Sequence, residues 1–444
     1  MLQHNHAARI RGMGQFKVPM WIIPLGYSVI AVLLAWAVPR IEASLFPEWT
    51  SPMTVSAAMA IYSAVATGMI ALTGIVFSLI FVMVQFSATA YSPRLVLWMA
   101  RDPFLFHAMG MFSATFLYAI GALAWVDRRH DEKVPFISVW LTVVLLMASI
   151  VVFMGLVQRL NRLQVDRALG FTADFGRRVI EFIYPPLETS SAVTPASEFR
   201  LLPLTQSLIY NGPPRPIQSL DIGALLARAE DSDAVIEVLA AVGDTLVEST
   251  PMLRVFGARG TIAEHELRKA IKTGMERTFE QDPKYSIRLL VDIAVRALSA
   301  AVNDPTTAVQ ALDQIEDLLL RVGRRRLEIG EIRNRFGTLR LVFPVPTWED
   351  FLELAFSEIR ACGKDSVQVM RRMNALLTDL TDRLPAERHA ALRSQRRRLA
   401  ALIAESFPDS EDRLEASAED REGLGATRKH PVKGSPELQS ASRI

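Results

Sequence analysis

The chain has 444 residues, of which 50% are hydrophobic and 22% are charged, and its formal net charge is +2. This balanced charge gives no indication of nucleic-acid binding. The single cysteine, Cys362, excludes internal disulfides, paired redox cysteines and cysteine-based zinc sites. The sequence also lacks the HExxH, GxxxxGK[ST], GxGxxG and GxSxG patterns. We therefore expect no enzyme activity, no catalytic residues, no cofactor and no metal site.

Long uncharged runs in the first third of the chain indicate its class. There are 22 uncharged residues between Lys17 and Arg40, 45 from Trp49 to Pro93, and shorter runs of 24 and 25 before Arg159. A helix needs about 20 apolar residues to cross a bilayer. The sequence therefore predicts an integral membrane protein with a transmembrane domain over 19–157. The four predicted spans are residues 19–39, 55–86, 103–126 and 134–157.

Basic residues predict the orientation of these spans. They are enriched in residues 1–18, in the loop 87–102 and directly after the fourth span, whereas the loop 40–54 has one arginine and two glutamates. Positively charged loops remain on the cytoplasmic side, so both termini are predicted to be cytoplasmic. The short loop 127–133 has three basic residues and opposes this pattern. The first span could instead be a cleaved signal peptide, which would leave the C-terminal half on the same side.

The polar remainder of the chain divides into five predicted segments. Helical spacing of apolar residues predicts a juxtamembrane helix, and a Ser/Thr/Pro-rich linker follows it. A small β-containing module and a helical domain come next, before a charged tail that we expect to be disordered. Asp282-Pro283 and Asn303-Asp304-Pro305 are typical helix starts in the helical domain. The five segments are residues 158–187, 188–203, 204–260, 261–405 and 406–444.

Two stretches resemble a known family. They are SLIFVMVQFSATAYSPRL at 78–95 and RLLVDIAVRALSAAVNDPTTA at 288–308. Together they resemble the predicted bacterial membrane proteins called domain of unknown function 2254 (DUF2254), over residues 15 to 400 approximately. The second stretch is the more specific, because its Arg and Asp spacing leads directly into Asn-Asp-Pro. The resemblance implies a multi-pass inner-membrane protein with four spans and a cytoplasmic domain, and it implies no established activity.

A row of small residues marks one face of the second span. The steps between them alternate between four and three residues, which keeps them on one side of a helix. Such a face can pack closely against another transmembrane helix, or it can line a pore in an oligomer. The sequence leaves both interpretations open. The residues are Ala60, Ala64, Thr67, Ala71, Gly74, Ser78 and, one heptad further, Gln85.

Polar residues follow at the end of the same span. They could form the cytoplasmic mouth of a pore, facing ions or lipid headgroups. Alternatively they form a helix stop with an interfacial tyrosine and an arginine that reaches the headgroups. The residues are Ser87, Thr89, Tyr91, Ser92, Pro93 and Arg94.

A third set of polar residues lies in the helical domain. Arg288, Asp292 and Arg296 are spaced by four residues and share one helix face. A helix N-terminus follows them and favours anions. The set could bind a phosphate or carboxylate ligand, or it could be a structural network that holds two helices together. The residues at that N-terminus are Asn303, Asp304, Thr306 and Thr307.

The predicted fold is mainly α, with a four-helix transmembrane bundle followed by a cytoplasmic α+β domain and a disordered tail. The favoured hypothesis is an oligomeric channel or transport-type protein whose cytoplasmic domain assembles or gates it. The alternative is a membrane-anchored regulatory or scaffold protein whose cytoplasmic domain binds a small ligand or a protein. The expected partners are the lipid bilayer and further copies of the chain, with no nucleic acid.

Overall fold

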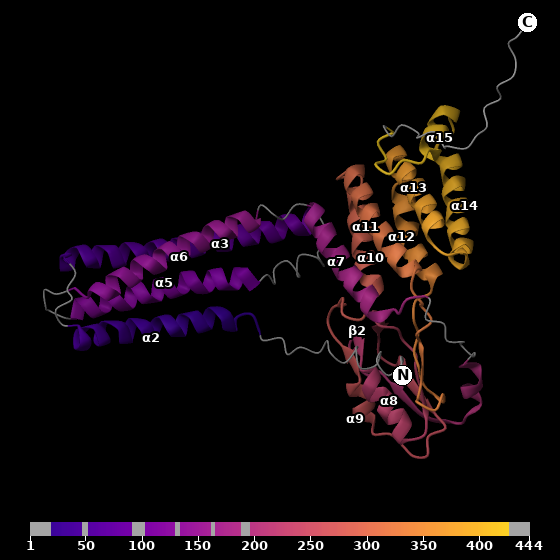
Figure 1. Cartoon of the computed structure of the whole chain (residues 1–444), viewed down its shortest axis with the longest axis horizontal. Helices are drawn as coiled ribbons and strands as arrows, with labels where there is room; N and C mark the ends of the chain where they lie inside the picture. Colours follow the sequence, from indigo (N-terminus) through magenta and orange to yellow (C-terminus); the bar gives the residue numbers. More distant parts are fainter. Residues whose placement is uncertain are drawn as a thin grey trace, which may run out of the picture. The chain divides into compact units, whose positions relative to one another are not determined.

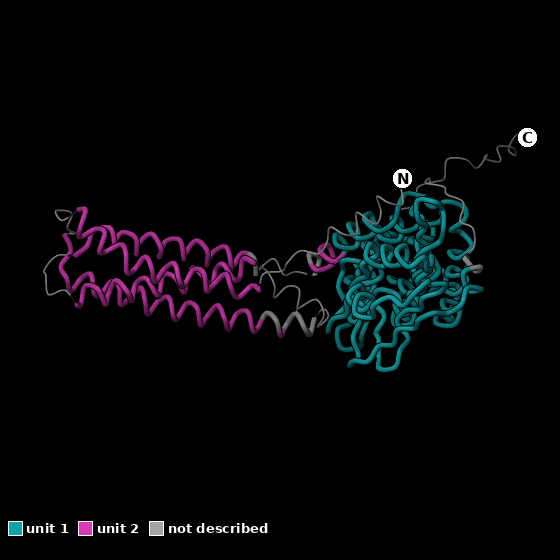
Figure 2. The backbone as a smooth tube through the Cα atoms, turned by 90° about the horizontal axis from the view of Figure 1, so that it is seen from below, with its two compact units in different colours: residues 1–7, 173–444 teal, residues 8–172 magenta. Residues whose placement is uncertain are grey.

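The computed structural model describes residues 19–46, 52–90, 103–128, 134–160, 165–187 and 196–425. It divides into two compact units (Figure 2), residues 8–172 and residues 1–7 with 173–444. We call the first the membrane unit and the second the polar unit. The division falls inside helix α7 (Val165–Ile183), and each unit is described by itself.

Apart from the start of α7, four long apolar helices make up the described part of the membrane unit (Figure 1), in agreement with the uncharged runs of the sequence. Each contains a stretch that is long and apolar enough to cross a membrane. The helices are α2 (Ile22–Leu45), α3 (Val55–Ala90), α5 (Pro103–Arg128) and α6 (Phe136–Leu160).

The first helix continues beyond the predicted span. The sequence places Arg40 and Glu42 in a loop, but α2 runs through Pro39 to Leu45. The Glu42 side chain is buried and accepts hydrogen bonds from the backbone amides of Ile137 and Ser138 at the start of α6. These amides lack partners within their own helix, so the extension of α2 satisfies them.

Helix α5 contacts the other three helices of the membrane unit, and its contact with α2 depends on glycines. A Cβ atom placed on Gly121 would lie 2.5 Å from the Cβ of Ala35, and one on Gly110 would lie 2.8 Å from the Tyr27 ring. Only glycine permits this separation of the two backbones. Inside a bilayer, burial of apolar surface does not drive helices together, so close packing at small residues holds them instead.

Hydroxyl groups connect α5 to α6 on its other side. The Thr115 and Ser149 hydroxyls lie 2.8 Å apart, and those of Tyr118 and Ser138 lie 3.1 Å apart. All four side chains are buried. Polar groups at membrane depth need a partner inside the protein, so these pairs specify how the two helices align.

Two sheets form the β part of the polar unit. A five-stranded sheet has the order β1-β5-β3-β8-β7, in which β3 and β8 are parallel and the other pairs are antiparallel. A three-stranded antiparallel sheet has the order β4-β2-β6. Helices α8 (Ile222–Asp231) and α9 (Glu264–Lys269) accompany the strands. The strands are β1 (Leu204–Ile209), β2 (Arg215–Leu220), β3 (Val235–Val238), β4 (Thr245–Leu246), β5 (Pro251–Phe256), β6 (Ile271–Thr273), β7 (Glu331–Arg333) and β8 (Leu339–Val342).

The β part differs from the predicted module over 204–260. Strands β6, β7 and β8 come from the range 261–405, for which the sequence predicts only helices. Each has four residues or fewer, which is too short for an alternating pattern to stand out. Strand β8 joins the sheet by parallel pairing with β3. The paired residues of the two strands lie about a hundred positions apart in the sequence. Local sequence cannot reveal such a pairing.

Helices complete the polar unit. The predicted starts at Asp282-Pro283 and Asp304-Pro305 are confirmed by α10 and α11. Residues 348–383 form two helices, because the chain turns between Gly363 and Ser366. The short 3-10 helices η2 (Ala196–Leu201) and η3 (Ala386–Arg388) precede β1 and α14. The helices are α10 (Pro283–Ala297), α11 (Pro305–Gly323), α12 (Trp348–Cys362), α13 (Val367–Arg383), α14 (His389–Ser406) and α15 (Ser410–Ser417).

Helix α15 corrects the prediction of a disordered tail for residues 406–425. Asp409 caps this helix by accepting from the amides of Glu411 and Asp412. The segment then attaches to α13, where Arg421 donates both of its hydrogen bonds to Asp379 at 2.6 and 2.9 Å. A charged composition does not exclude order when the charges find partners on a neighbouring helix. Residues 426–444 lie outside the described residues.

Candidate functional site

The small face of α3 is exposed in the structure. The opposite side of the helix is the buried one, and it contributes Ala58, Tyr62, Val65, Met69 and Val76 to the core shared with α5. The predicted face therefore does not mediate the packing of α3 within its own bundle. The exposed residues are Ala60, Ala64, Thr67, Ala71, Gly74, Ser78 and Gln85.

Gly74 on this face, and Gly68 beside its Thr67, have open space where a side chain would begin. A Cβ on Gly68 or Gly74 would meet no atom within 4 Å, whereas one on Gly121 in α5 would be only 2.5 Å from Ala35. Small residues on a membrane helix allow close approach of another helix. In the described chain, α5 makes such a close contact with α2, whereas the small face of α3 stays exposed.

The other outward surfaces of the membrane unit have large apolar side chains. Leu33 and Trp36 on α2 and Val144 and Val151 on α6 are each more than half exposed. Side chains of this kind suit lipid tails. Large residues such as Ile70 also flank the small face of α3, so the face is a narrow strip between lipid-compatible edges.

The predicted mouth lies only partly within the described residues. Helix α3 continues to Ala90, so Ser87 and Thr89 are helical and do not belong to a loop. Tyr91, Ser92, Pro93 and Arg94 lie outside the described residues. The mouth hypothesis therefore stays a prediction.

The arginine and aspartate face of α10 is an ion-pair network. Arg288 contacts Asp292 on its own helix at 2.5 Å and forms a two-pronged pair with Glu358 of α12. The hydrogen bond from Arg288 lowers the pKa of Glu358, and the Glu358 and Asp292 carboxylates raise the pKa of Arg288. Arg296 lies one turn further on, and its carbonyl accepts from the Ser299 hydroxyl. This arrangement holds α10 to α12.

The predicted anion site at the start of α11 is occupied by the chain itself. Asp304 caps this helix, because its carboxylate accepts from the amide and the hydroxyl of Thr307 at 3.1 and 2.6 Å. Asn303 has a positive φ of 47° and turns the chain between α10 and α11. Asn303 and Thr306 are exposed. Among the contacts of the described residues, none joins Arg288 or Arg296 to this cap, which favours a structural role for the set.

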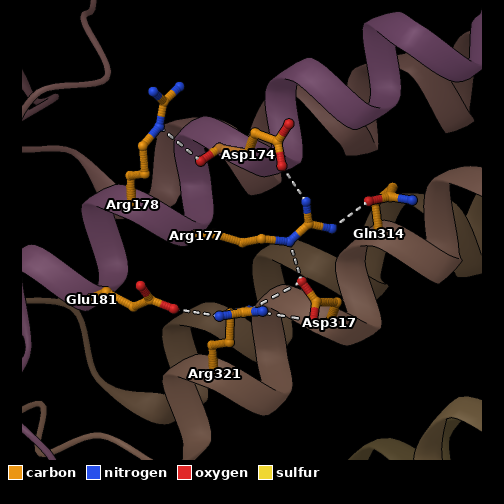
Figure 3. A network of polar contacts seen from close by, with 7 residues as sticks. All are labelled: Asp174, Arg177, Arg178, Glu181, Gln314, Asp317 and Arg321. Carbon is orange, nitrogen blue, oxygen red and sulfur yellow. Dashed lines mark hydrogen bonds and ion pairs between the residues drawn. The ribbon is translucent and has the colours of Figure 1, made fainter.

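A second polar network joins α7 to α11 (Figure 3), and the sequence analysis did not identify it. Arg177 on α7 donates to Asp317 at 2.6 Å and to Gln314 at 2.9 Å on α11. Arg321 contacts the same Asp317 at 3.2 Å and pairs with Glu181 on α7. Although burial opposes it, the Asp317 and Asp174 carboxylates raise the pKa of Arg177. The partners are about 140 positions apart, so no local spacing reveals them.

Apolar contacts reinforce the attachment of α7 within the polar unit. The Phe175 ring stacks on Phe279 with their centroids 4.9 Å apart. A Cβ on Gly176 would lie 2.9 Å from atoms of both Leu318 and Ser286, so α7 approaches α10 and α11 closely. Helix α7 follows the last apolar helix in the chain and is firmly fixed at its C-terminal end.

A buried ion pair lies at the start of α10. Asp282 is almost fully buried, and Arg277 donates two hydrogen bonds to one of its oxygens at 2.9 and 2.5 Å. Burial raises the pKa of Asp282, although Arg277 opposes this effect. Gly243, with a φ of 93°, packs so closely over the pair that a Cβ there would lie 2.4 Å from Asp282. The pair joins the β4 turn to the helical part.

Within the ranges that the structure describes, no three His, Cys, Asp or Glu side chains are grouped as metal ligands. The arginine networks of the polar unit pair their charges within the chain. The small face of α3 is therefore the candidate functional site, because its residues are exposed and do not contribute to the core of the described bundle.

Comparisons with known proteins agree with this membrane architecture. A model of the family described as "Predicted membrane protein (DUF2254)" matches residues 17–379. Uncharacterized proteins of Mycobacterium bovis and Mycobacterium tuberculosis are 25% identical to the chain over 412 residues, covering 89% of it and 78% of each relative. No solved structure matches the chain.

Proposed function

The chain belongs to the DUF2254 family of predicted membrane proteins, and we propose that it is a subunit of an oligomeric channel or transport-type protein. Copies of the chain would associate through the small face of α3. The same face would line or border the path through the membrane. The polar unit would assemble or gate this path.

One observation supports the proposal above all. The small face of α3 is exposed along its length, although small residues favour close helix contacts and large ones suit lipid. At Gly68 and Gly74 the described chain supplies no atom within 4 Å. A helix from a second copy could therefore approach there as closely as α2 approaches α5.

The chemistry of this face is compatible with a water-filled path. Thr67, Ser78 and Gln85 add polar groups to it, and it carries no charge. Small, weakly polar residues leave room for water in a pore. The absence of charge favours transport of a solute without tight ion coordination on α3.

Helix α7 supports a gating role for the polar unit. It follows α6 after four residues and is fixed to α11 through Arg177, Asp317 and Arg321. The gating hypothesis therefore assigns the link between the two units to α7, the helix in which their division falls. The basic residues near the N-terminus and after α6 favour a placement in the bacterial inner membrane with both termini cytoplasmic.

The test measures oligomeric mass and conductance of the same variants. The full chain, purified in mild detergent, is analysed by light scattering corrected for bound detergent, and then reconstituted into planar bilayers. We expect a closed assembly of four or more copies. Gly74→Leu should reduce the mass to that of a protomer or change the conductance. The leucine side chain would occupy the space that the proposal gives to a helix of a second copy or to the path through the membrane.

A matched control separates this interface from lipid-facing positions. Val151 on α6 is 68% exposed, and Val151→Leu should change neither the mass nor the conductance. A monomeric wild-type chain would overturn the proposal. Equal behaviour of Gly74→Leu and Val151→Leu would also overturn it.

A further inference from the structure

An exposed arginine lies near the C-terminal end of α2. The uncharged run between Lys17 and Arg40 has 22 residues, about the number that a helix needs to cross a bilayer. Arg40 follows this run directly and still belongs to α2. It therefore lies at the depth of the lipid headgroups when α2 spans the membrane.

Apolar side chains precede Arg40 on the same outward face of α2. Val29, Leu33 and Trp36 are 51%, 59% and 61% exposed, and Arg40 is exposed as well. The steps from Val29 to Arg40 are four, three and four residues, so the four side chains share one face. The rise from Val29 to Arg40 is about 16 Å, which is close to half of a bilayer core of about 30 Å. The face therefore matches one leaflet, with a cation at its headgroup end.

Two tryptophans hold the Arg40 side chain in place. Its Cζ lies 4.5 Å from the centre of the Trp36 ring on α2 and 4.4 Å from that of the Trp125 ring on α5. Its Nη1 also donates to the Trp36 carbonyl at 2.5 Å. An arginine that stacks on aromatic rings keeps N–H groups at its edge for other acceptors. Two helices therefore preorganise this guanidinium group, which reduces the entropy lost when it binds a ligand.

The charge of Arg40 is not paired with a carboxylate among the described residues. The Glu42 carboxylate, two residues further on, accepts from two backbone amides of α6. Helix α5 ends in the exposed Asp127 and Arg128, whose charges are opposite and together add no net charge. A guanidinium group has five N–H donors, and in the described chain one of them has an acceptor. Arg40 therefore offers both charge and donors to a molecule outside the chain.

We propose that Arg40 binds the phosphate group of an anionic phospholipid whose acyl chains lie along Val29, Leu33 and Trp36. Arginine binds phosphate through two parallel N–H···O bonds, and tryptophan is favoured at the interface where these phosphates lie. An anionic headgroup is preferred to a zwitterionic one, because the ammonium group of the latter already compensates its phosphate. The inference concerns α2 and α5, so it holds whether or not the chain conducts or assembles through α3.

Native mass spectrometry of the full chain in mild detergent tests the proposal by counting bound lipids. The chain is titrated with phosphatidylglycerol and, separately, with phosphatidylcholine that has the same acyl chains. We expect the wild type to bind the first phosphatidylglycerol about fivefold more tightly. Arg40→Gln should weaken this binding about tenfold, because the charged hydrogen bonds are lost. Arg128→Gln is the matched control: it removes an exposed arginine at the end of α5 and should bind as the wild type does.

Two further measurements separate a lipid site from a simple interfacial charge. Trp36→Leu should weaken the binding of phosphatidylglycerol about threefold, because Arg40 loses one of its two rings. Inorganic phosphate in excess should leave the lipid bound, since it has no acyl chains.

Three outcomes would overturn the proposal. They are equal affinities of the wild type for the two lipids, equal losses in Arg40→Gln and Arg128→Gln, and displacement of phosphatidylglycerol by inorganic phosphate, which would assign the site to a soluble anion. The first and third need only the wild type, so the proposal stays testable if Arg40→Gln fails to fold.

Discussion

The membrane unit and the polar unit hold their helices together by different means. In the membrane unit, α2 and α5 meet where Gly121 faces Ala35, and buried hydroxyl pairs join α5 to α6. In the polar unit, arginines such as Arg177 and Arg288 bridge helices through carboxylates. Burial of apolar surface drives association in water but not between helices in lipid. Close backbone contact therefore takes its place in the bilayer.

This comparison explains why the small face of α3 stands out. In the membrane unit a small residue is the normal sign of a helix contact, and the described chain buries such residues at α2 and α5. On α3, by contrast, the small residues lie on an exposed surface. This difference is the reason for the proposal that copies of the chain associate through the small face. The following experiments test each side of the comparison.

The largest effect is expected at the α2–α5 contact. Gly121→Leu places a side chain where a Cβ alone would already be 2.5 Å from Ala35. The backbones must separate, and we expect a loss of about 3 kcal/mol or more of stability. Unfolding of the purified chain in increasing SDS measures this loss. Wild-type stability in this variant would show that the two helices are not in close contact.

A second substitution of the same kind on α3 should affect assembly and not the protomer. A Cβ placed on Gly68 would meet no atom within 4 Å, so we expect Gly68→Leu to change the stability of the protomer by only about 0.5 kcal/mol. The oligomeric mass should fall, as for Gly74→Leu. SDS unfolding and light scattering on one sample compare the two quantities. A destabilisation equal to that of Gly121→Leu would place this face inside the bundle.

A moderate effect is expected from the network between α7 and α11. Asp317→Asn removes the charge that Arg177 and Arg321 share. Because these side chains are roughly one third exposed, we expect a loss of about 1 kcal/mol at low salt. The loss should shrink in high salt, since ions screen exposed pairs. Thermal unfolding of the polar unit, followed within the full chain, measures it at both salt concentrations.

The smallest effect concerns the pH dependence of the α10–α12 contact. Arg288 lowers the pKa of Glu358 in the folded chain. The contribution of this pair is therefore present above the carboxyl's unfolded pKa and is lost as the pH falls through its lower folded value. Glu358→Gln should remove this part of the acid-side loss of stability. Thermal unfolding of both chains across the acid range checks it, and parallel pH profiles would contradict it.

Local patterns in the sequence determined the class of the protein and many of its elements. The uncharged runs are long enough that only membrane helices accommodate them, and α10 and α11 begin where Asp-Pro pairs permit no continued helix. The spacing of Ala60, Ala64 and Thr67 also placed them on one helix face. These features depend on residues within a few turns of one another, so they can be read without the fold.

Only the tertiary structure decided which surfaces are used. Helical spacing shows that residues share a face, but it does not show whether that face is buried, and the small face of α3 proved to be exposed. Glu42 looked like a loop residue until α6 was placed beside it. Arg177 met Asp317, and β3 met β8, across more than a hundred positions. Such contacts depend on chain segments that only folding brings together.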